Sequence, residues 1–284
     1  MSPVAGLAYA PNINWLLADL PSGERPRAVA QAGFEAIEFG FPSTVDLEAI
    51  DEARKAYGLE VVLFNQEVPL WDRQNRGYLS DAKRRDEFQR TLDEALTLAG
   101  RLQAKKIMLP AGVELPGIDR RVQRDWVIEN LQAAAPLAAQ AGVLLTIEVL
   151  NPADNPGYWL TSSHEAVDIV RHVDHPHVRV QFDTYHLHLV EGEVPETFRR
   201  YAAWLGHVQF GDAPGRVRPR TGEVDFSAVL QVLRTAGYEG FIGLEYIPAD
   251  GGPEELDWVS AEMRSQSRPR RESPAVADTT LSEE

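Results

Sequence analysis

The 284-residue sequence contains no cysteine. Disulfides, zinc-thiolate sites, iron–sulfur clusters and thiol nucleophiles are therefore excluded. Basic residues are also scarce, because 28 lysines and arginines stand against 43 aspartates and glutamates, and the formal net charge is -15. Phosphate binding needs basic stripes, so this balance argues against a nucleic acid as partner, whereas a small anionic substrate needs only one or two local cations.

Long apolar runs are missing as well. No stretch approaches the roughly 18 apolar residues that a membrane helix needs, so no membrane partner is expected. The beginning, MSPVAGLAYAPNINWLL, has no basic region and is interrupted by Pro11 and Asn12, which argues against a signal peptide. Hydrophobic residues still make up 44% of the chain, enough for a sizeable core. These features predict a soluble, cytoplasmic metabolic protein.

Short β-rich runs alternate with amphipathic segments along the whole chain. The predicted strands are Asn12–Leu17, Ala36–Phe41, Glu60–Asn65, Lys106–Pro110, Val143–Leu150, Val178–Asp183, His207–Phe210 and Phe241–Tyr246. The predicted helices are Glu24–Ala32, Leu47–Tyr57, Asp86–Leu102, Asp125–Gln140, His164–Val173, Glu196–Leu205, Phe226–Ala236 and Glu254–Arg264. Several of these helices stop at a glycine just before a strand, which is the usual C-terminal cap.

This alternation predicts an α/β fold with a parallel sheet. Eight units within about 250 residues favour a single-domain, closed (β/α)₈ TIM barrel over residues 1–264. A doubly wound open sheet is the runner-up, but no GxGxxG follows the first strand. The long connection Gln66–Arg85, which contains Trp71, is expected to be functional. Residues 265–284 lose the apolar pattern and are expected to form a disordered tail.

One acid, Glu148, stands inside the apolar run VLLTIEVLN. An unpaired buried carboxylate is costly, so such a group usually neutralises, pairs or binds a metal. The next three predicted strands also carry a polar residue near their ends, namely Asp183, Gln209 and Glu245. In a barrel of this kind the strand ends meet at one face, where the active site lies. The pattern therefore predicts that the four side chains converge.

Such a set offers only oxygen ligands, which suit Mg²⁺ or Mn²⁺, whereas zinc sites usually include His or Cys. Three converging carboxylates would repel strongly without a cation. Each residue also has a simpler interpretation, because a single acid at a strand end can cap the next helix, Asp183 can start a turn and Gln209 can satisfy backbone groups. Four such groups at equivalent positions favour the metal site.

The order of several short motifs resembles the hydroxypyruvate isomerase family, within the xylose isomerase-like barrels that include the ketose 3-epimerases. The resemblance spans nearly all of Asn12 to Trp258, and its landmarks are NINWLLADLP, AGFEAIEF, VVLFN, PAGVELPG, ENLQAAAPLAAQAGVLLTIEVLN, QFDTYH, GHVQFGDAPGR, TGEVDF and YEGFIGLEY. At position 209 the chain has Gln, as the hydroxypyruvate isomerases do, whereas the epimerases typically have His.

The resemblance implies that Glu148, Asp183, Gln209 and Glu245 bind a divalent metal and that Glu148 and Glu245 also move protons. The implied reaction is an aldose–ketose type isomerisation of hydroxypyruvate or a related small keto acid or keto sugar, such as 2-oxo-tetronate, through an enediolate. Two further residues are candidates for substrate binding. His186 lies three residues after Asp183, and Arg216 matches an arginine of the family in the loop after strand seven. A surface-loop histidine and a solvated basic loop are the competing interpretations.

Two positions depart from the family pattern. Ile247 stands where a lysine is usual, and Met108 stands near the place of a histidine at the end of strand four. These changes favour a larger or neutral keto sugar, or a 2-oxo-tetronate, over hydroxypyruvate. Three other functions remain open: a ketose 3-epimerase, a DNA-repair endonuclease of the endonuclease IV type, and a barrel that only binds its ligand. The resemblance also suggests a homo-oligomer.

Overall fold

The computed structural model describes residues 7–68, 75–249 and 253–265 of the chain. Its strands are β1 (Tyr9–Pro11), β2 (Ala36–Glu38), β3 (Glu60–Asn65), β4 (Lys106–Met108), β5 (Leu144–Glu148), β6 (Val178–Asp183), β7 (Leu205–Phe210) and β8 (Ile242–Leu244). Its α-helices are α1 (Arg25–Gln31), α2 (Leu47–Tyr57), α3 (Arg85–Leu102), α4 (Arg120–Ala141), α5 (Ser163–Val173), α6 (Thr184–Glu191), α7 (Val194–Tyr201) and α8 (Phe226–Thr235).

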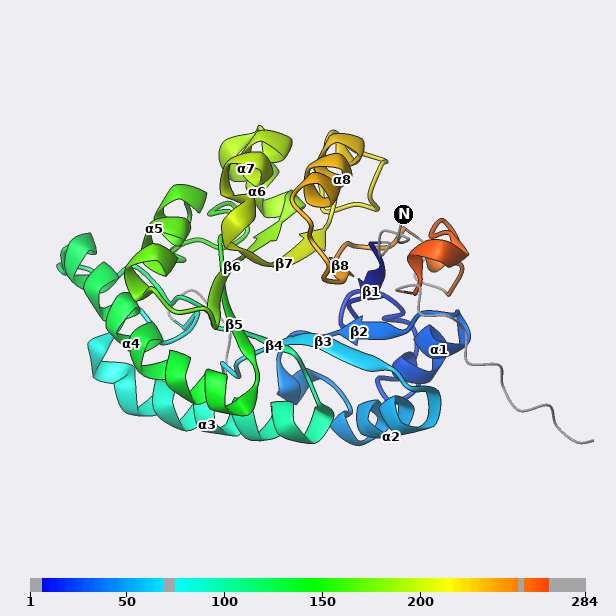
Figure 1. Ribbon diagram of the computed structural model, residues 1–284, viewed down its shortest axis with the longest axis horizontal. Helices are drawn as coiled ribbons and strands as arrows, with labels where there is room; N and C mark the ends of the chain where they lie inside the picture. The colour runs from blue at the N-terminus through cyan, green and yellow to red at the C-terminus, as the bar shows by residue number, and fades with distance from the viewer. Residues whose placement is uncertain (1–6, 69–74, 250–252, 266–284) are drawn as a thin grey trace, which may run out of the picture.

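The strands form one parallel sheet that curls into a barrel, with the helices outside it (Figure 1). The order in the sheet is β1-β8-β7-β6-β5-β4-β3-β2, and the remaining gap between β1 and β2 is spanned by a single bridge between Asn12 and Glu38. There the Ile13 N–H donates to the Glu38 carbonyl at 3.0 Å. The predicted single-domain (β/α)₈ barrel is thus confirmed, as a nearly closed barrel.

Helix ends follow the local chemistry of the sequence. The Asp46 side chain accepts from the backbone N–H groups of Glu48 and Ala49 at the start of α2, and that helix ends at Gly58 with φ 70°. Helix α4 begins after Asp119, whose side chain accepts from the Arg121 N–H, and ends at Gly142 with φ 68°. Glycine adopts this left-handed backbone without strain. In the described residues, no helix is both long and apolar enough to cross a membrane.

The prediction of the first strand, Asn12–Leu17, is wrong. The strand ends at Pro11, and the Asn12 side-chain oxygen accepts from the Asn14 N–H at 3.1 Å, a turn that asparagine favours. The N–H groups of Trp15 and Leu16 then bond to the Asn12 carbonyl. The apolar residues Ile13, Leu16 and Leu17, which suggested a strand, are buried all the same, in irregular backbone rather than in the sheet.

The prediction of a last helix, Glu254–Arg264, is also wrong. Two short 3₁₀ segments, η4 (Pro253–Leu256) and η5 (Ala261–Met263), take its place. The Arg264 guanidinium donates to the carbonyls of Ala32, Leu256 and Val259, so a side chain satisfies oxygens that a helix would bond internally. The predicted tail beyond residue 265 and the position of Trp71 lie outside the described residues.

Gly243 in β8 leaves the space that a buried carboxylate occupies. A methyl group added there would lie 2.5 Å from the carboxyl carbon of Glu38. We therefore expect Gly243→Ala to lower the free energy of unfolding by about 1–3 kcal/mol, as overpacking does, measured by urea denaturation. Gly100→Ala in α3 is the control, because its added methyl meets nothing within 4 Å and should raise stability by roughly 0.5–1 kcal/mol. Equal stability of Gly243→Ala and the unchanged protein would contradict the tight fit.

Candidate active site

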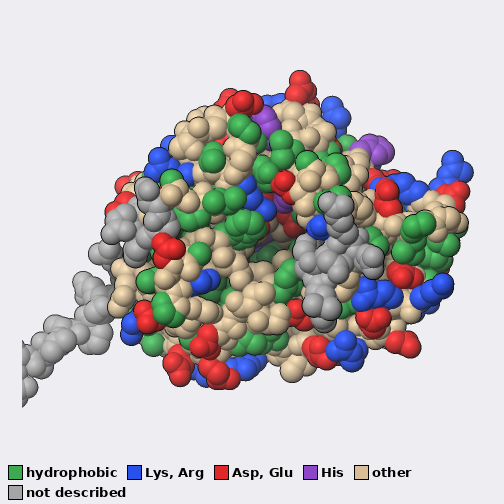
Figure 2. Space-filling model, turned by 180° about the vertical axis from the view of Figure 1, so that it is seen from behind, with side chains coloured by type: hydrophobic (Ala, Val, Ile, Leu, Met, Phe, Trp, Pro, Cys, Tyr) green, Lys and Arg blue, Asp and Glu red, His purple; other side chains and the backbone are tan. Residues whose placement is uncertain are grey.

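A cavity of about 800 Å³ opens at the carboxyl ends of the strands, and Glu148, His186, Arg216 and Glu245 are among the residues that line it. The face turned toward the viewer in Figure 2 is hollowed near its centre, with charged side chains visible inside the hollow. This is the face on which barrels of this type carry their sites. The cavity therefore has the place and size of a small-molecule pocket.

The four predicted ligand residues all reach this end of the barrel. Glu148 and Asp183 are the last residues of β5 and β6, Gln209 lies near the end of β7, and Glu245 directly follows β8. The Gln209 amide nitrogen donates to the Glu245 carboxylate. Asp183 and Glu245 are both bonded by Arg216, at 2.7 and 2.6 Å. Gln209, Glu245 and Asp183 are thus linked through one direct hydrogen bond and through Arg216, and Glu148 lies near Asp183 and lines the same cavity.

Burial places these acids in an unfavourable environment for three negative charges. It raises the pKa of Glu148 well above the usual value, and the charges of Glu245 and Asp183 raise it further. Burial raises the pKa of Asp183 to about 7 although Arg216 opposes the shift. The pKa of Glu245 is raised by burial as well. Such a cluster tends to bind protons or a cation, because its negative charge is neither exposed to solvent nor balanced by an equal number of basic side chains.

Asp183 also has the simpler role considered for it. Its Oδ1 accepts from the Tyr185 N–H at 2.8 Å and caps α6, a helix that the sequence analysis missed. The other oxygen, Oδ2, faces Arg216 and the cavity side. Since a carboxylate has several acceptor positions, the cap and a ligand role do not exclude each other.

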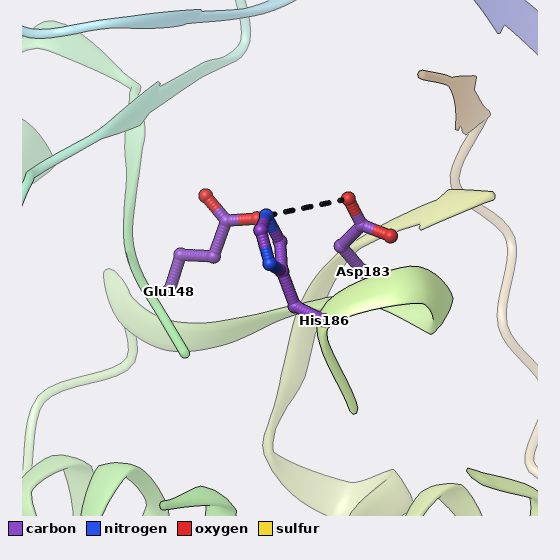
Figure 3. Close-up of side chains that lie close together, drawn as sticks. All are labelled: Glu148, Asp183 and His186. Carbon is purple, nitrogen blue, oxygen red and sulfur yellow. Dashed lines mark ion pairs between the residues drawn. The ribbon is translucent and has the colours of Figure 1, made fainter. Parts of the chain in front are cut away.

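His186 lies on α6 and is buried, so its interpretation as an exposed loop histidine is wrong. In Figure 3 its ring lies between Glu148 and Asp183, and its Nε2 is 3.9 Å from Asp183 Oδ2. Burial lowers its pKa well below the usual value, so the ring is neutral. The Asn151 backbone N–H donates to Nδ1 at 3.2 Å. The proton of the neutral ring is therefore on Nε2, which points a donor at the two acids.

The Arg216 side chain is 11% exposed and lies in the site, so its interpretation as a solvated basic loop residue is wrong. Its guanidinium lies 4.6 Å from the Trp15 ring centre and donates to both Asp183 and Glu245. The backbone is anchored too, because the Ile247 N–H donates to the Arg216 carbonyl at 2.7 Å. Arg216 thus neutralises part of the acid cluster and holds it together.

The two positions that depart from the family pattern both line the cavity. Met108 is buried in its wall, and Ile247 is 51% exposed at its edge. They place apolar surface where charged or polar groups are expected. Among the described lining residues, Arg216 is the one that carries a basic side chain, and it already pairs with Asp183 and Glu245.

A polar layer beneath the four residues was missed. It contains Thr146, Gln181 and His207, all fully or almost fully buried inside the barrel. Glu38 belongs to this layer as well, because it is completely buried and its Oε2 lies 2.7 Å from His207 Nε2. Side chains alternate along a strand, so residues two positions before each ligand face the same interior. That spacing could have identified the layer.

The residues present fit a hard divalent cation. Glu148, Asp183 and His186 each place one potential ligand atom within 4.8 Å of the others. Because the His186 Nε2 carries a proton, the carboxylates rather than the imidazole are suited to hold the ion. Carboxylate oxygens are ligands that hard divalent cations such as Mg²⁺ and Mn²⁺ prefer.

Comparison with known proteins gives a consistent result. Residues 26–263 match the family model described as the xylose isomerase-like TIM barrel. The chain is 34% identical to the 2-oxo-tetronate isomerase of Cupriavidus necator, over 88% of this chain and 96% of that one. It is 30% identical to the hydroxypyruvate isomerase of Escherichia coli, over 89% and 98%. A crystal structure described as an AP endonuclease, family 2, from Brucella melitensis is 32% identical, with a TM-score of 0.84 over 89% and 98% of the two chains.

Proposed function

Because the chain belongs to the xylose isomerase-like TIM barrel family, we propose that it is a metal-dependent aldose–ketose isomerase of the hydroxypyruvate isomerase type. The substrate is a small keto acid or keto sugar, such as hydroxypyruvate or 2-oxo-tetronate, and the reaction moves a proton between neighbouring carbons through an enediolate. Relatives named as isomerases of these two keto acids support the proposal. We further propose that the enzyme acts in the cytoplasm.

The observation that carries the proposal is a pair of carboxylates, the buried Glu148 and the partly buried Glu245, that line one cavity from different strands. Burial raises the pKa of both groups. A carboxyl group with a pKa nearer neutrality can both accept and return a proton at physiological pH. We assign the two residues as the acid/base pair. One of them takes the proton from the substrate carbon, and one of the two donates a proton to the neighbouring carbon.

We assign Glu148, Asp183, Gln209 and Glu245 as the residues that would hold Mg²⁺ or Mn²⁺. When bound, the ion would supply a Lewis acid that stabilises negative charge on the substrate oxygens. His186 presents its Nε2 proton to the same space and would donate to a substrate oxygen. Arg216 lines the cavity beside Glu245 and would donate to a hydroxyl or carboxylate of the substrate.

An endonuclease function is less well supported, although one similar structure carries that description. Such an enzyme needs a histidine-rich zinc site and a basic groove for DNA. In the part of the chain that the structure describes, the candidate metal group contains one histidine, His186. The net charge of -15 also disfavours a DNA substrate. The ketose 3-epimerase remains the closest alternative, because the same two acids could act on opposite faces of one carbon.

The proposal predicts proton exchange that depends on the metal. The protein is stripped with EDTA and incubated in D₂O with hydroxypyruvate, 2-oxo-tetronate or ketoses, with and without Mg²⁺ or Mn²⁺. NMR should show deuterium entering the carbon next to the carbonyl, and an isomeric product, only when metal is present. An epimer at carbon 3 of a ketose would favour the epimerase instead. Absence of exchange with every substrate and metal would overturn the isomerase assignment.

A further inference from the structure

Below the cavity, polar side chains form a continuous path through the barrel interior. Lys106 Nζ, at the start of β4, lies 3.2 Å from His207 Nδ1. His207 Nε2 lies 2.7 Å from Glu38 Oε2, and the Gln209 amide nitrogen donates to Glu38 Oε1 at 2.7 Å. Glu38 and His207 are completely buried. Four side chains from three strands are therefore connected from the beginning of β4 to the candidate metal site.

The donors and acceptors in this path have one consistent direction. An ammonium group only donates, so Lys106 donates to His207 Nδ1, and the imidazole proton is on Nε2, from which it is donated to Glu38. Glu38 accepts three hydrogen bonds, from His207, Gln209 and, at 3.3 Å, Asn12. All three partners donate to Glu38, so the geometry suits the acceptor form of the carboxyl group.

The direction of the path fixes the Gln209 amide. Its nitrogen donates to Glu38 and Glu245, so its oxygen faces the other way and accepts from Gln181 at 2.8 Å. The Gln181 oxygen is in turn occupied by the Thr146 hydroxyl at 3.0 Å. A flipped Gln209 amide would place its oxygen against two carboxylates. The amide oxygen keeps a second lone pair for another partner.

Such a charged interior is unusual, because barrels of this type are filled mainly by branched apolar side chains. Burying Glu38 near the partly buried Lys106 costs free energy that the attraction between the two charges repays only with good geometry. The backbone leaves room for Glu38, since Gly243 has no side chain where the Glu38 carboxylate lies. The arrangement ends at Gln209 and at Asn12, and Asn12 also donates to Glu245 at 3.2 Å. An arrangement that costs free energy and ends at these residues points to a role in the site above it.

We propose that Lys106, His207 and Glu38 are positioning residues, a hydrogen-bond relay that orients the Gln209 amide oxygen for the cation. The inference rests on the proposed function, in which Gln209 is a ligand. The relay acts only through Gln209 and Asn12 and does not touch the substrate. Partners of metal ligands that fix ligand orientation in this way commonly change metal affinity by 10- to 100-fold when they are replaced.

The test replaces Glu38 with Gln, which keeps the shape but turns one acceptor atom into a donor. Isothermal titration of the metal-free protein with Mn²⁺ should then show about 10- to 100-fold weaker binding. Far-UV circular dichroism should remain unchanged. The control is Asp51→Asn, since Asp51 is a buried carboxylate on α2 that accepts from Arg54 and Lys55 outside the barrel interior. Its Mn²⁺ affinity should equal that of the unchanged protein.

A second pair of variants covers the case in which Glu38→Gln does not fold. Lys106→Met removes the first donor of the relay and should weaken Mn²⁺ binding several-fold, whereas Lys106→Arg keeps a donor and should restore it. Tight Mn²⁺ binding by the unchanged protein together with equal binding by Glu38→Gln or Lys106→Met would overturn the relay alone. Absence of Mn²⁺ binding by the unchanged protein would overturn the metal role of the site and the relay with it.

Discussion

Replacing Glu148 with Gln is expected to lower kcat by about 10²–10⁴-fold at saturating Mn²⁺, because the amide keeps a ligand oxygen but cannot take up a proton. Glu245→Gln should cause a loss of similar size. The measurement is the steady-state rate with the best substrate, accompanied by deuterium exchange at carbon. Exchange should fall together with turnover, since both need abstraction of the same proton.

Two comparisons separate this loss from damage to the fold. Glu114→Gln, which removes an exposed acid paired with Arg120, should leave kcat unchanged. Circular dichroism of the Glu148 and Glu245 variants should match that of the unchanged protein. Activity near the original level in both single variants would refute the assignment of the acid/base pair.

Glu148→Gln should also stabilise the metal-free protein, and the sign follows from the pKa. Burial, with Glu245 and Asp183, raises the folded-state pKa of Glu148, so folding takes up a proton. The stabilisation from this proton is fully present below the pKa of the unfolded chain and disappears as pH rises through the folded-state pKa. The variant has no proton to lose at this position, so its stability does not fall in this way as the pH rises. Its melting temperature should therefore exceed that of the unchanged protein at pH 8 and differ little at pH 4.

The barrel could be predicted from the sequence because its evidence is repeated in every unit. Each strand-and-helix unit buries its own apolar face, and glycines such as Gly58 and Gly142 mark helix ends by a backbone conformation that other residues avoid. The errors at the first strand and at the last helix occurred where a side chain replaces the regular backbone bonds. Asn12 turns the chain after β1, and Arg264 satisfies the carbonyls of Leu256 and Val259 in the last segment. Apolar periodicity does not detect such replacements.

The four strand-end residues could be predicted because one rule, the shared carboxyl end of parallel strands, places all of them. The layer below follows from a second rule, the alternation of side chains along a strand. Thr146, Gln181, His207 and Gly243 each stand two residues before a predicted ligand, and a strand returns to the same face every two residues. The contact of Glu38 with His207 could not be predicted, because it joins residues 169 positions apart across the barrel.

Arg216→Met is expected to lower the free energy of unfolding of the metal-free protein by about 3–5 kcal/mol at pH 8. Removing one partner of a buried ion pair leaves uncompensated charge, which is the costly case. Arg216 bonds Asp183 and Glu245, whose side chains are 0% and 14% exposed. Methionine keeps much of the packing against Trp15, so the loss should come mainly from the charge. Urea denaturation measures it.

The loss should shrink at pH 5, because protonated acids no longer need the cation. Burial already raises the pKa of Asp183 to about 7 against the opposing effect of Arg216, and without Arg216 it would rise further. In the variant the carboxyl groups are therefore neutral at pH 5. As the pH rises to 8 they lose protons, and the resulting negative charges have no cation to compensate them. Arg25→Met is the control, since Arg25 donates to the carbonyls of Ile13, Ala18 and Leu20, and its loss should not depend on pH in this range.

Added Mn²⁺ connects this effect to the metal site. If the acids hold a divalent cation, that ion supplies the charge that Arg216→Met removes, so Mn²⁺ should recover much of the lost stability at pH 8. The gain on adding Mn²⁺ should be larger for the variant than for the unchanged protein, in which Arg216 already compensates part of the charge. A loss that is equal at pH 5 and pH 8 and insensitive to Mn²⁺ would assign Arg216 to packing against Trp15 and Tyr185 alone.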